Sequence, residues 1–372
     1  MERDPWHYPR KSFAQLVINN YQAIRALTLY SPRRTGKTAF VLGDLVPSAI
    51  AANLTPIYVD LWSNQQNTAR AIISMLRRSY VELTVADTRA GRTLQQPVER
   101  IQALGFGVTL GELPEPDEPD DDLSRIEYWF HKVLDASGRP VLLIVDEAQQ
   151  IALDPQGDAV AGALRSVLQT QAHRLLAFFT GSSQHNLAAM FDDARAPFYQ
   201  FGQQLRLPAL ERDFTDHVAT CFETIATTLE LDRDKLFAAF EALDCRPGPF
   251  REMTDGLLVA NSDDIDAYLE QQKTDDRQRV ELMLENRSLS IRETLVAARV
   301  AHGCEYASLR ARQYYARYEN KVKPLNAGLV DRAVKRLCEA NIIDRGRGHG
   351  ALRIASSALA DLLRERFPDA KD

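Results

Sequence analysis

The stretch from Ala26 to Phe40, ALTLYSPRRTGKTAF, constrains the fold of this chain more than any other part of the sequence. Its first part, Ala26 to Tyr30, has the length and β-leaning composition of a parallel strand that is covered on both faces. The next segment, Ser31 to Thr38, fits the phosphate-binding pattern G-x-x-x-x-G-K-[ST] except at its first position, where serine stands for glycine. The stretch therefore predicts a buried strand, a phosphate-binding loop and a helix in succession.

This loop carries the groups that grip a nucleoside triphosphate. Gly36 lets the backbone approach phosphate oxygens, and the N–H groups of the loop and of the following helix form an anion cradle. Lys37 is expected to neutralise the β- and γ-phosphates, and the hydroxyl of Thr38 to bind Mg²⁺. Ser31 departs from the pattern because a non-glycine residue resists left-handed backbone angles. The predicted nucleotide-binding residues of this segment are Ser31, Pro32, Arg33, Arg34, Thr35, Gly36, Lys37, Thr38 and Ala39.

A second strand supplies the acidic half of the predicted site. Val141 to Val145 is a continuous apolar run that ends in Asp146 and Glu147. Asp146 is expected to hold Mg²⁺ together with Thr38, and Glu147 to be the base that orients the attacking water. The alternative is that both carboxylates are solvated residues that close a buried strand. The two segments together predict ATP and Mg²⁺ as cofactors, and a GTPase is disfavoured because no N-K-x-D motif occurs.

Three segments resemble those of the archaeal-type ATPases in the AAA+/STAND branch of P-loop proteins. They are SPRRTGKT from Ser31, VDEAQ from Val145, and TGSS from Thr180, which ends a later apolar strand. The resemblance implies an α/β P-loop core with a parallel sheet and a small helical lid over the nucleotide. It also implies that a polar residue at the tip of the later strand senses the γ-phosphate. Ser182 is the first candidate for this sensor and Thr180 the second.

The same resemblance raises the question of which arginines reach the nucleotide. Related ATPases often carry one just before the last strand of the core, where this chain has no arginine in the segment Pro197 to Phe201, so Arg195 is the nearest substitute. In the lid, Arg246 or Arg251 is expected to act as a sensor beside the turn that begins at Asp244. Arg33 and Arg34 are typical of the branch, and their contact with nucleotide is left open.

Length and composition indicate a multidomain protein of ordinary globular type. At about 100–200 residues per domain, a chain of 372 residues is expected to form two or three domains. We expect residues 1–210 to form the P-loop core, with an acidic surface insertion at about 86–122, because seven carboxylates and three prolines between Gly111 and Asp122 cannot bury a core. Apolar residues at helical spacing predict a helical lid over 211–285, and a winged-helix domain is expected over 286–372.

The C-terminal part is a basic module on an acidic chain. Between Asn286 and Gly350 there are thirteen lysines and arginines against six acidic residues, whereas the whole chain carries a net charge of −6. Ser290 and Glu293 form a capping box that opens a helix, and two further helices and a Gly/Arg-rich hairpin from Ile342 to Ile354 resemble a winged helix. Duplex DNA is one predicted partner, and a protein partner is the alternative. The expected DNA contacts are Arg332, Lys335, Arg336, Arg345 and Arg347.

Other features limit the classes of protein that remain. The sequence has no apolar run of the ~18 residues that a membrane span needs and no signal-peptide core at its start, so we expect a cytoplasmic protein without a membrane partner. Its four cysteines, Cys221, Cys245, Cys304 and Cys338, form no C-x-x-C pair, which argues against a zinc site and a disulfide framework.

The sequence therefore predicts a slow, Mg²⁺-dependent ATPase that works as a molecular switch. ATP at the core–lid cleft would set the lid angle and so reposition the winged helix on DNA or a protein partner. A non-hydrolysing, STAND-like, nucleotide-gated signalling protein is the first alternative. An oligomeric remodelling motor ranks below it, because no substrate-gripping pore loop stands out.

Overall fold

The computed structural model describes residues 4–20, 24, 26–32, 34–64, 67–86, 118–182, 187, 190–191, 196–286, 289–340, 342–345, 352–354 and 357–371. Most of the predicted acidic insertion, together with Arg33, Arg195 and Arg347, lies outside these residues. The chain divides into two compact units, Met1–Asp263 and Asp264–Asp372. Each unit is described by itself below.

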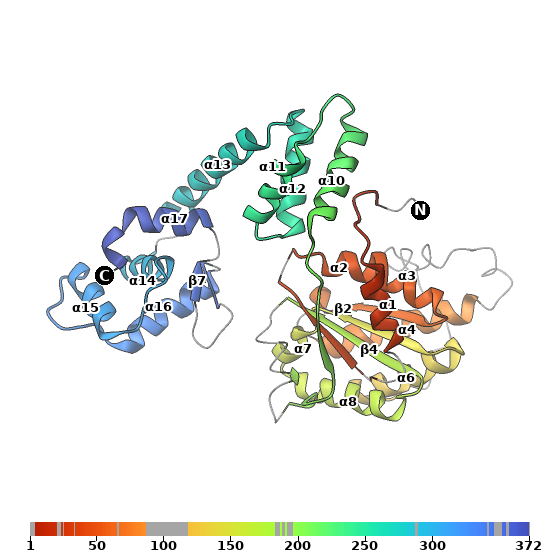
Figure 1. Ribbon diagram of the computed structural model, residues 1–372. Coiled ribbons are helices and arrows are strands. Elements are labelled where there is room, and N and C mark those ends of the chain that lie inside the picture. The colour runs from red at the N-terminus through yellow and green to blue at the C-terminus, as the bar shows by residue number, and fades with distance from the viewer. Residues whose placement is uncertain are drawn as a thin grey trace. The chain divides into compact units, whose positions relative to one another are not determined.

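A parallel five-stranded sheet with the order β2-β3-β4-β1-β5 forms the centre of the first unit (Figure 1). Every residue of β3 and β4 is buried, which is the reason that both strands read as continuous apolar runs. Because β4 lies between β1 and β3, its carboxyl end stands beside both the loop after β1 and the residues after β3. The strands are β1 (Ala26–Tyr30), β2 (Thr55–Asp60), β3 (Val141–Asp146), β4 (Leu175–Gly181) and β5 (Gln203–Arg206).

Helices cover both faces of this sheet. Side chains of β3 alternate between two cores, with Leu143 and Val145 on the side of α4, α6 and α8, and Leu142 and Ile144 on the side of α1, α2 and α3. The segment between α2 and α3 is a π-helical turn, η1. The covering elements are α1 (Lys11–Asn19), α2 (Lys37–Phe40), η1 (Val41–Leu45), α3 (Val46–Ala51), η2 (Leu61–Asn64), α4 (Thr68–Ala86), α6 (Asp122–Ser137), α7 (Gln149–Leu153) and α8 (Gly157–Thr170).

Three helices after β5 make the predicted lid of the first unit: α10 (Arg212–Ile225), α11 (Arg233–Ala242) and α12 (Pro247–Ala260). One aromatic side chain from each helix meets at their centre, and the ring centroids of Phe240 and Phe250 lie 4.9 Å apart. Pro247 begins α12, a position where its missing N–H costs nothing.

The second unit consists of helices and a two-stranded antiparallel hairpin, the elements expected of a winged helix. The predicted capping box is present, because Ser290 accepts from the backbone of Glu293 and Glu293 accepts from the backbone of Ser290. The elements are α13 (Ile265–Asn286), α14 (Ile291–Ala301), α15 (Leu309–Tyr318), α16 (Ala327–Glu339), β6 (Ile343–Arg345), β7 (Leu352–Ile354), α17 (Ser357–Arg366) and η4 (Pro368–Lys371).

The predicted fold class is confirmed: a parallel α/β core with a phosphate-loop strand, followed by a helical lid and a C-terminal helix-and-hairpin unit. The helices α17 and η4 were not predicted from the sequence. Among the described residues, no helix combines the length and the apolar character that crossing a bilayer requires.

Candidate nucleotide-binding site

The phosphate loop joins β1 to α2, as predicted. Gly36 has a φ of 85°, a left-handed angle that favours glycine. At the first position of the loop, the hydroxyl of Ser31 shares a 2.7 Å hydrogen bond with the hydroxyl of Thr35, which also donates to the carbonyl of Pro32 at 2.7 Å. The hydroxyl of Ser31 therefore stabilises the loop through a hydrogen bond within it. The loop forms without the glycine that the pattern has at this position.

Lys37 lies folded against its own loop. Its ammonium donates to the carbonyl oxygens of Ser31 at 2.7 Å and Pro32 at 3.0 Å, and the side chain is almost fully buried. A buried ammonium needs acceptors, and the loop supplies them.

Asp146 is the most heavily bonded carboxylate of the site. One oxygen accepts from the hydroxyls of Thr38 at 3.0 Å and Tyr58 at 2.9 Å, and the other accepts from the hydroxyl of Thr180 and from the backbone of Glu147 at 3.0 Å. Asp146 is only 3% exposed. The structure thus brings together Thr38 and Asp146, the two residues predicted to hold Mg²⁺, across 108 positions of sequence.

Two neighbours on β2 complete this acidic edge of the sheet. Burial, followed by the charge of Asp146, raises the pKa of Tyr58, so this hydroxyl stays a donor. Burial also raises the pKa of Asp60, helped by the charges of Asp146 and Glu147 and opposed by a 2.8 Å hydrogen bond from the backbone of Trp62. A cation at this edge would find carboxylate and hydroxyl oxygens, which are the ligands that Mg²⁺ prefers.

Glu147, the predicted base, is hydrogen-bonded to Ser182, the predicted sensor of the γ-phosphate. The hydroxyl of Ser182, at the tip of β4, donates to its Oε2 at 2.7 Å, and the amide of Gln149 donates to the same oxygen. Glu147 has a φ of 53°, which is unusual for a non-glycine residue. Gln149 belongs to the VDEAQ segment, and no role was predicted for it from the sequence.

The lid touches the phosphate loop directly. The backbone N–H of Gly248 donates to the carbonyl of Arg34 at 3.0 Å, and the guanidinium of Arg34 forms an ion pair with Glu252. The two lid arginines predicted as sensors are engaged elsewhere: Arg246 pairs with Asp244, and Arg251 pairs with Asp255. Ala39 is exposed in the first turn of α2, and Arg33 and Arg195 lie outside the described residues.

Arg10, which was not predicted from the sequence, is a neighbour of the loop. A Cβ added at Gly36 would lie 3.4 Å from Nη1 of Arg10 and 3.7 Å from Cγ of Pro247. Asp44 of η1 holds Arg10 in place by accepting from its backbone N–H at 2.9 Å. Burial lowers the pKa of Arg10 against the opposing charge of Asp44, and its Nε is buried without a hydrogen-bond partner among the described residues. No motif marked this residue, because its place depends on the folded path of residues 4–10.

The basic residues of the second unit differ in how they are engaged. Arg336 forms a 3.0 Å ion pair with the buried carboxylate of Glu293, and Nε of Arg332 donates to the carbonyl of Gly328 at 3.1 Å. Lys335 is exposed on α16, Arg345 lies in β6 with its side chain outside the described atoms, and Arg347 is not described. Arg336, one of the predicted DNA contacts, is therefore engaged in an ion pair within its own unit.

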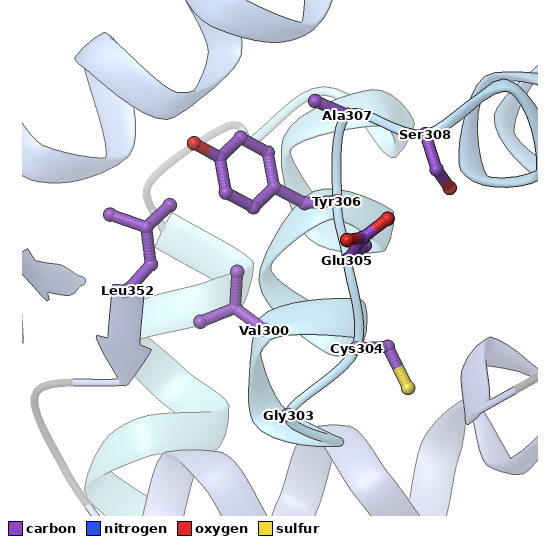
Figure 2. A pocket seen from close by; sticks show the side chains of 8 residues that line it. All are labelled: Val300, Gly303, Cys304, Glu305, Tyr306, Ala307, Ser308 and Leu352. Carbon is purple, nitrogen blue, oxygen red and sulfur yellow. The ribbon is translucent and has the colours of Figure 1, made fainter. Parts of the chain in front are cut away.

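A cavity of about 480 Å³ lies within the second unit (Figure 2). The α14–α15 connection and β7 line it, and it contains no residue of the phosphate loop or of the Asp146 edge. The groups predicted to bind nucleotide converge instead in the first unit. The lining residues of the cavity are Val300, Gly303, Cys304, Glu305, Tyr306, Ala307, Ser308 and Leu352.

Comparison with known proteins supports the fold. No protein-family model matches the sequence, and no curated protein does. The Walker-type ATPase Paby2304 of Pyrococcus abyssi is similar over 96% of both chains, with a TM-score of 0.59 and 16% sequence identity. The ORC2 protein of Aeropyrum pernix, in ADPNP–ADP complexes, is similar over 97% of this chain and 92% of its own, with a TM-score of 0.50 and 16% identity. The resemblance to archaeal ATPases is thus confirmed at the level of the fold.

Proposed function

We propose that this chain binds ATP and hydrolyses it slowly, and that the nucleotide acts as a switch for the C-terminal unit. The single observation that carries the proposal is the 3.0 Å hydrogen bond between Thr38 and Asp146, which joins the end of the phosphate loop to the tip of β3. A hydroxyl and a carboxylate from these two motifs are the pair that holds Mg²⁺ in P-loop NTPases.

The residues present fit a magnesium nucleotide. Gly36 keeps the loop open to phosphate, Lys37 supplies a buried positive charge, and Thr38 and Asp146 supply oxygen ligands. When bound, Mg²⁺ neutralises charge on the phosphates. Arg10 also supports a bound nucleotide. Its guanidinium lies beside Gly36, and its Nε has no hydrogen-bond partner among the described residues. A positive, partly unpaired group beside an anion cradle favours a ligand with negative charge.

Each remaining residue of the site has a proposed role in hydrolysis. Glu147 orients a water and accepts its proton as the oxygen attacks the γ-phosphorus and the bond to the β–γ bridging oxygen breaks. Ser182 donates to an oxygen of the γ-phosphate, and Lys37 turns from the carbonyls of its loop to the phosphates. The products are ADP and phosphate.

The contact between the lid and the phosphate loop supports the proposed switch. Arg34 is part of the phosphate loop, and both its carbonyl and its guanidinium bind the first turns of α12. A change in the loop on nucleotide binding therefore reaches the lid through two bonds. Lid movement would then reposition the C-terminal unit, which continues the chain after Asp263.

Duplex DNA is the partner that charge favours, and a protein surface is the second candidate. Exposed Arg332 and Lys335 on α16 and the arginines of the hairpin offer cations for phosphates, whatever the base sequence. The pairing of Arg336 with Glu293 favours a smaller DNA surface than the sequence analysis predicts. A mobility-shift titration with random duplex DNA, with and without ATP, tests this: a nucleotide-dependent shift supports DNA, and no shift in either state supports a protein partner.

A non-hydrolysing, nucleotide-gated protein is the alternative function, and the occupied carboxylate of Glu147 is the observation that favours it. Turnover of [γ-³²P]ATP by the wild type and by Glu147→Gln separates the two. The proposal predicts measurable release of phosphate by the wild type and little by the variant, with ATP binding retained in both. Equal release by both proteins would contradict the role of Glu147.

A further inference from the structure

Residues 5–10, which lead into α1, contact the lid and the core of the first unit at the same time. We call this segment the N-terminal strap. It runs from α1 to the side of α10 (Figure 1). Trp6 and Tyr8 contact the lid helices, whereas His7 and the backbone of Arg10 contact η1, the turn that follows α2. The strap therefore bridges two parts of the unit that are far apart in sequence.

The lid end of the strap is aromatic. The guanidinium of Arg251, in α12, lies over the ring of Trp6, 3.6 Å from the ring centroid. A cation this close to the face of an indole is attracted by the ring quadrupole. The ring of Tyr8 meets that of Phe214, in α10, edge to face, with centroids 5.8 Å apart. Two lid helices, α10 and α12, are thus bound to the strap.

The core end of the strap is centred on Asp44, whose side chain is buried, with the residue only 4% exposed. Its Oδ2 accepts from the backbone N–H of Arg10 at 2.9 Å, and its Oδ1 lies 3.1 Å from Nε2 of His7. The ring of His7 lies so close to Gly43 that a Cβ there would be 2.6 Å from Cε1 of the ring. Gly43 and Asp44 both belong to η1. The strap is therefore anchored on the segment that continues the helix of the phosphate loop.

We propose that the N-terminal strap holds the lid against the phosphate loop and so slows the release of bound nucleotide. The inference rests on the proposed nucleotide binding and adds a device that regulates it. The lid meets the loop where the N–H of Gly248 donates to the carbonyl of Arg34 at 3.0 Å. A nucleotide held between the loop and the lid leaves when this contact opens, so a device that keeps the contact closed prolongs the bound state.

The strap has no slack between its two ends. Trp6 and His7 are consecutive residues, and a trans peptide keeps their Cα atoms ~3.8 Å apart. When α12 moves away from the loop, either Arg251 leaves the ring of Trp6 or His7 leaves Asp44. The two contacts therefore act in series: loss of either one frees the lid, and loss of the second adds little.

Trp6→Ala tests the lid end. Hydrogen exchange of the Gly248 amide, measured without nucleotide, should speed up by about tenfold, the effect of one close cation–π contact. The peptide from Pro247 to Phe250 reports this change, because its two prolines have no N–H and only Gly248 and Phe250 contribute. Release of a fluorescent ATP analogue, chased with unlabelled ATP, should speed up by a similar factor. Trp6→Phe keeps a ring beneath Arg251 and should stay close to the wild type.

Gly43→Ala tests the core end. The added methyl overlaps the ring of His7 and displaces it from Asp44, so this variant should reproduce the faster exchange and the faster release. The double variant Trp6→Ala/Gly43→Ala should be no faster than the faster single variant, because the two ends act in series. Effects that multiply would show that the two residues merely pack at separate places, and would overturn the inference.

Phe237→Ala is the matched control, because the guanidinium of Arg212 lies over that ring within the lid itself, 5.6 Å from the centroid. Phe237 and Trp6 are both half-buried. The control loses a cation–π contact that does not cross to the core, so exchange at Gly248 and nucleotide release should equal those of the wild type.

The two measurements keep the inference and the proposed function separable. Trp6→Ala that binds nucleotide and matches the wild type in exchange at Gly248 and in release overturns the inference and leaves the proposed function intact. Wild-type protein that binds no nucleotide overturns the proposed function, and with it the effect on release. Exchange at Gly248 then still decides whether the strap holds the lid: faster exchange in Trp6→Ala supports the hold, and unchanged exchange contradicts it.

Discussion

The backbone N–H of Gly248, in the first turn of α12, donates a 3.0 Å hydrogen bond to the carbonyl of Arg34 in the phosphate loop. The two segments approach so closely that a Cβ on Gly248 would lie 2.7 Å from Cβ of Arg34 and 3.0 Å from its carbonyl oxygen. Glycine is therefore needed here for the approach of two backbones. In the proposed switch, this hydrogen bond carries the state of the loop to the lid.

Gly248→Ala is predicted to push α12 away from the loop. Since backbone atoms of Arg34 cannot yield as a flexible side chain does, we expect ATP affinity to fall by about tenfold, the equivalent of about 1.4 kcal/mol. Hydrogen exchange of the amides from Arg34 to Gly36 should speed up as well. Gly162→Ala in α8 is the control, because no atom of the described residues lies within 4 Å of the added methyl and alanine favours the helix. Unchanged exchange in the loop of Gly248→Ala would contradict the coupling.

Thr38 and Asp146 are predicted to act as one unit in metal-dependent binding. Thr38→Ser keeps the hydroxyl and should retain the increase in ATP affinity that Mg²⁺ gives, whereas Thr38→Ala should lose most of it. Asp146→Asn should lose it entirely, and should also destabilise the fold by about 1–3 kcal/mol, since an amide NH₂ would face hydroxyl and N–H donors. Titrations with and without EDTA measure these differences, and equal Mg²⁺ dependence in Thr38→Ala and Thr38→Ser would count against the site.

Asp60 gives a pH-dependent prediction. Burial is the largest cause of its raised pKa, so the folded state binds the proton more tightly than the unfolded state does. Protonation of Asp60 therefore stabilises the folded state relative to the ionised form. This contribution to stability is fully present below the unfolded pKa and is lost as pH rises through the folded pKa. At pH 7 the ionised carboxylate destabilises the folded state. Asp60→Asn should therefore raise the free energy of unfolding, while its amide oxygen still accepts from the backbone N–H of Trp62.

Urea unfolding of Asp60→Asn and of the wild type across pH 3 to 8 checks this. The advantage of the variant should shrink as pH falls and should vanish where Asp60 is protonated in both states. A constant difference across the whole range would show that the charge is not its cause.

The DNA hypothesis is tested best away from Arg336. Arg336→Ala would leave the buried carboxylate of Glu293 without its cation, so it is predicted to destabilise the second unit. Charge reversal of Arg332 and Arg347 together should instead lower duplex affinity with little loss of stability. The slope of log affinity against log salt should become shallower by about one for each DNA phosphate that the variant no longer neutralises.

Arg366→Glu, at an exposed position in the last turn of α17, is the control for net charge in this experiment. It changes the charge of the same unit at a residue that belongs neither to α16 nor to the hairpin. A loss of affinity and of salt slope as large as that of the double variant would show that bulk charge, and not the α16–hairpin surface, attracts DNA.

The parts of the site that the sequence could predict are those held in short motifs. Lys37 and Thr38 are fixed relative to Gly36 by a local turn, and Asp146 and Glu147 by the end of a buried strand, so pattern and spacing suffice. The parallel order of the sheet then brings these motifs to one edge. Their catalytic and binding roles remain predictions.

The partners that come from distant segments could not be predicted. Tyr58 reaches Asp146 only because β2 and β3 pair in register, and Arg10 reaches Gly36 only because Asp44 holds the residues before α1. The roles predicted for the two lid arginines also depend on packing and stay predictions. Arg246 and Arg251 stand near the expected turn, but acidic neighbours in their own segment engage both of them. A sequence motif fixes the position of a residue along the chain. The interactions of Tyr58, Arg10 and the lid arginines depend in addition on packing in three dimensions.

The central claim, that this chain holds a magnesium triphosphate between Lys37 and Asp146, is tested most directly by calorimetric titration of ATP in the presence of Mg²⁺. The account predicts a single site in the wild type, affinity lower by about a hundredfold in Lys37→Ala because the ammonium no longer binds the phosphates, and unchanged affinity in Lys132→Ala on the exposed face of α6. Lys37→Ala with the affinity of the wild type would contradict it.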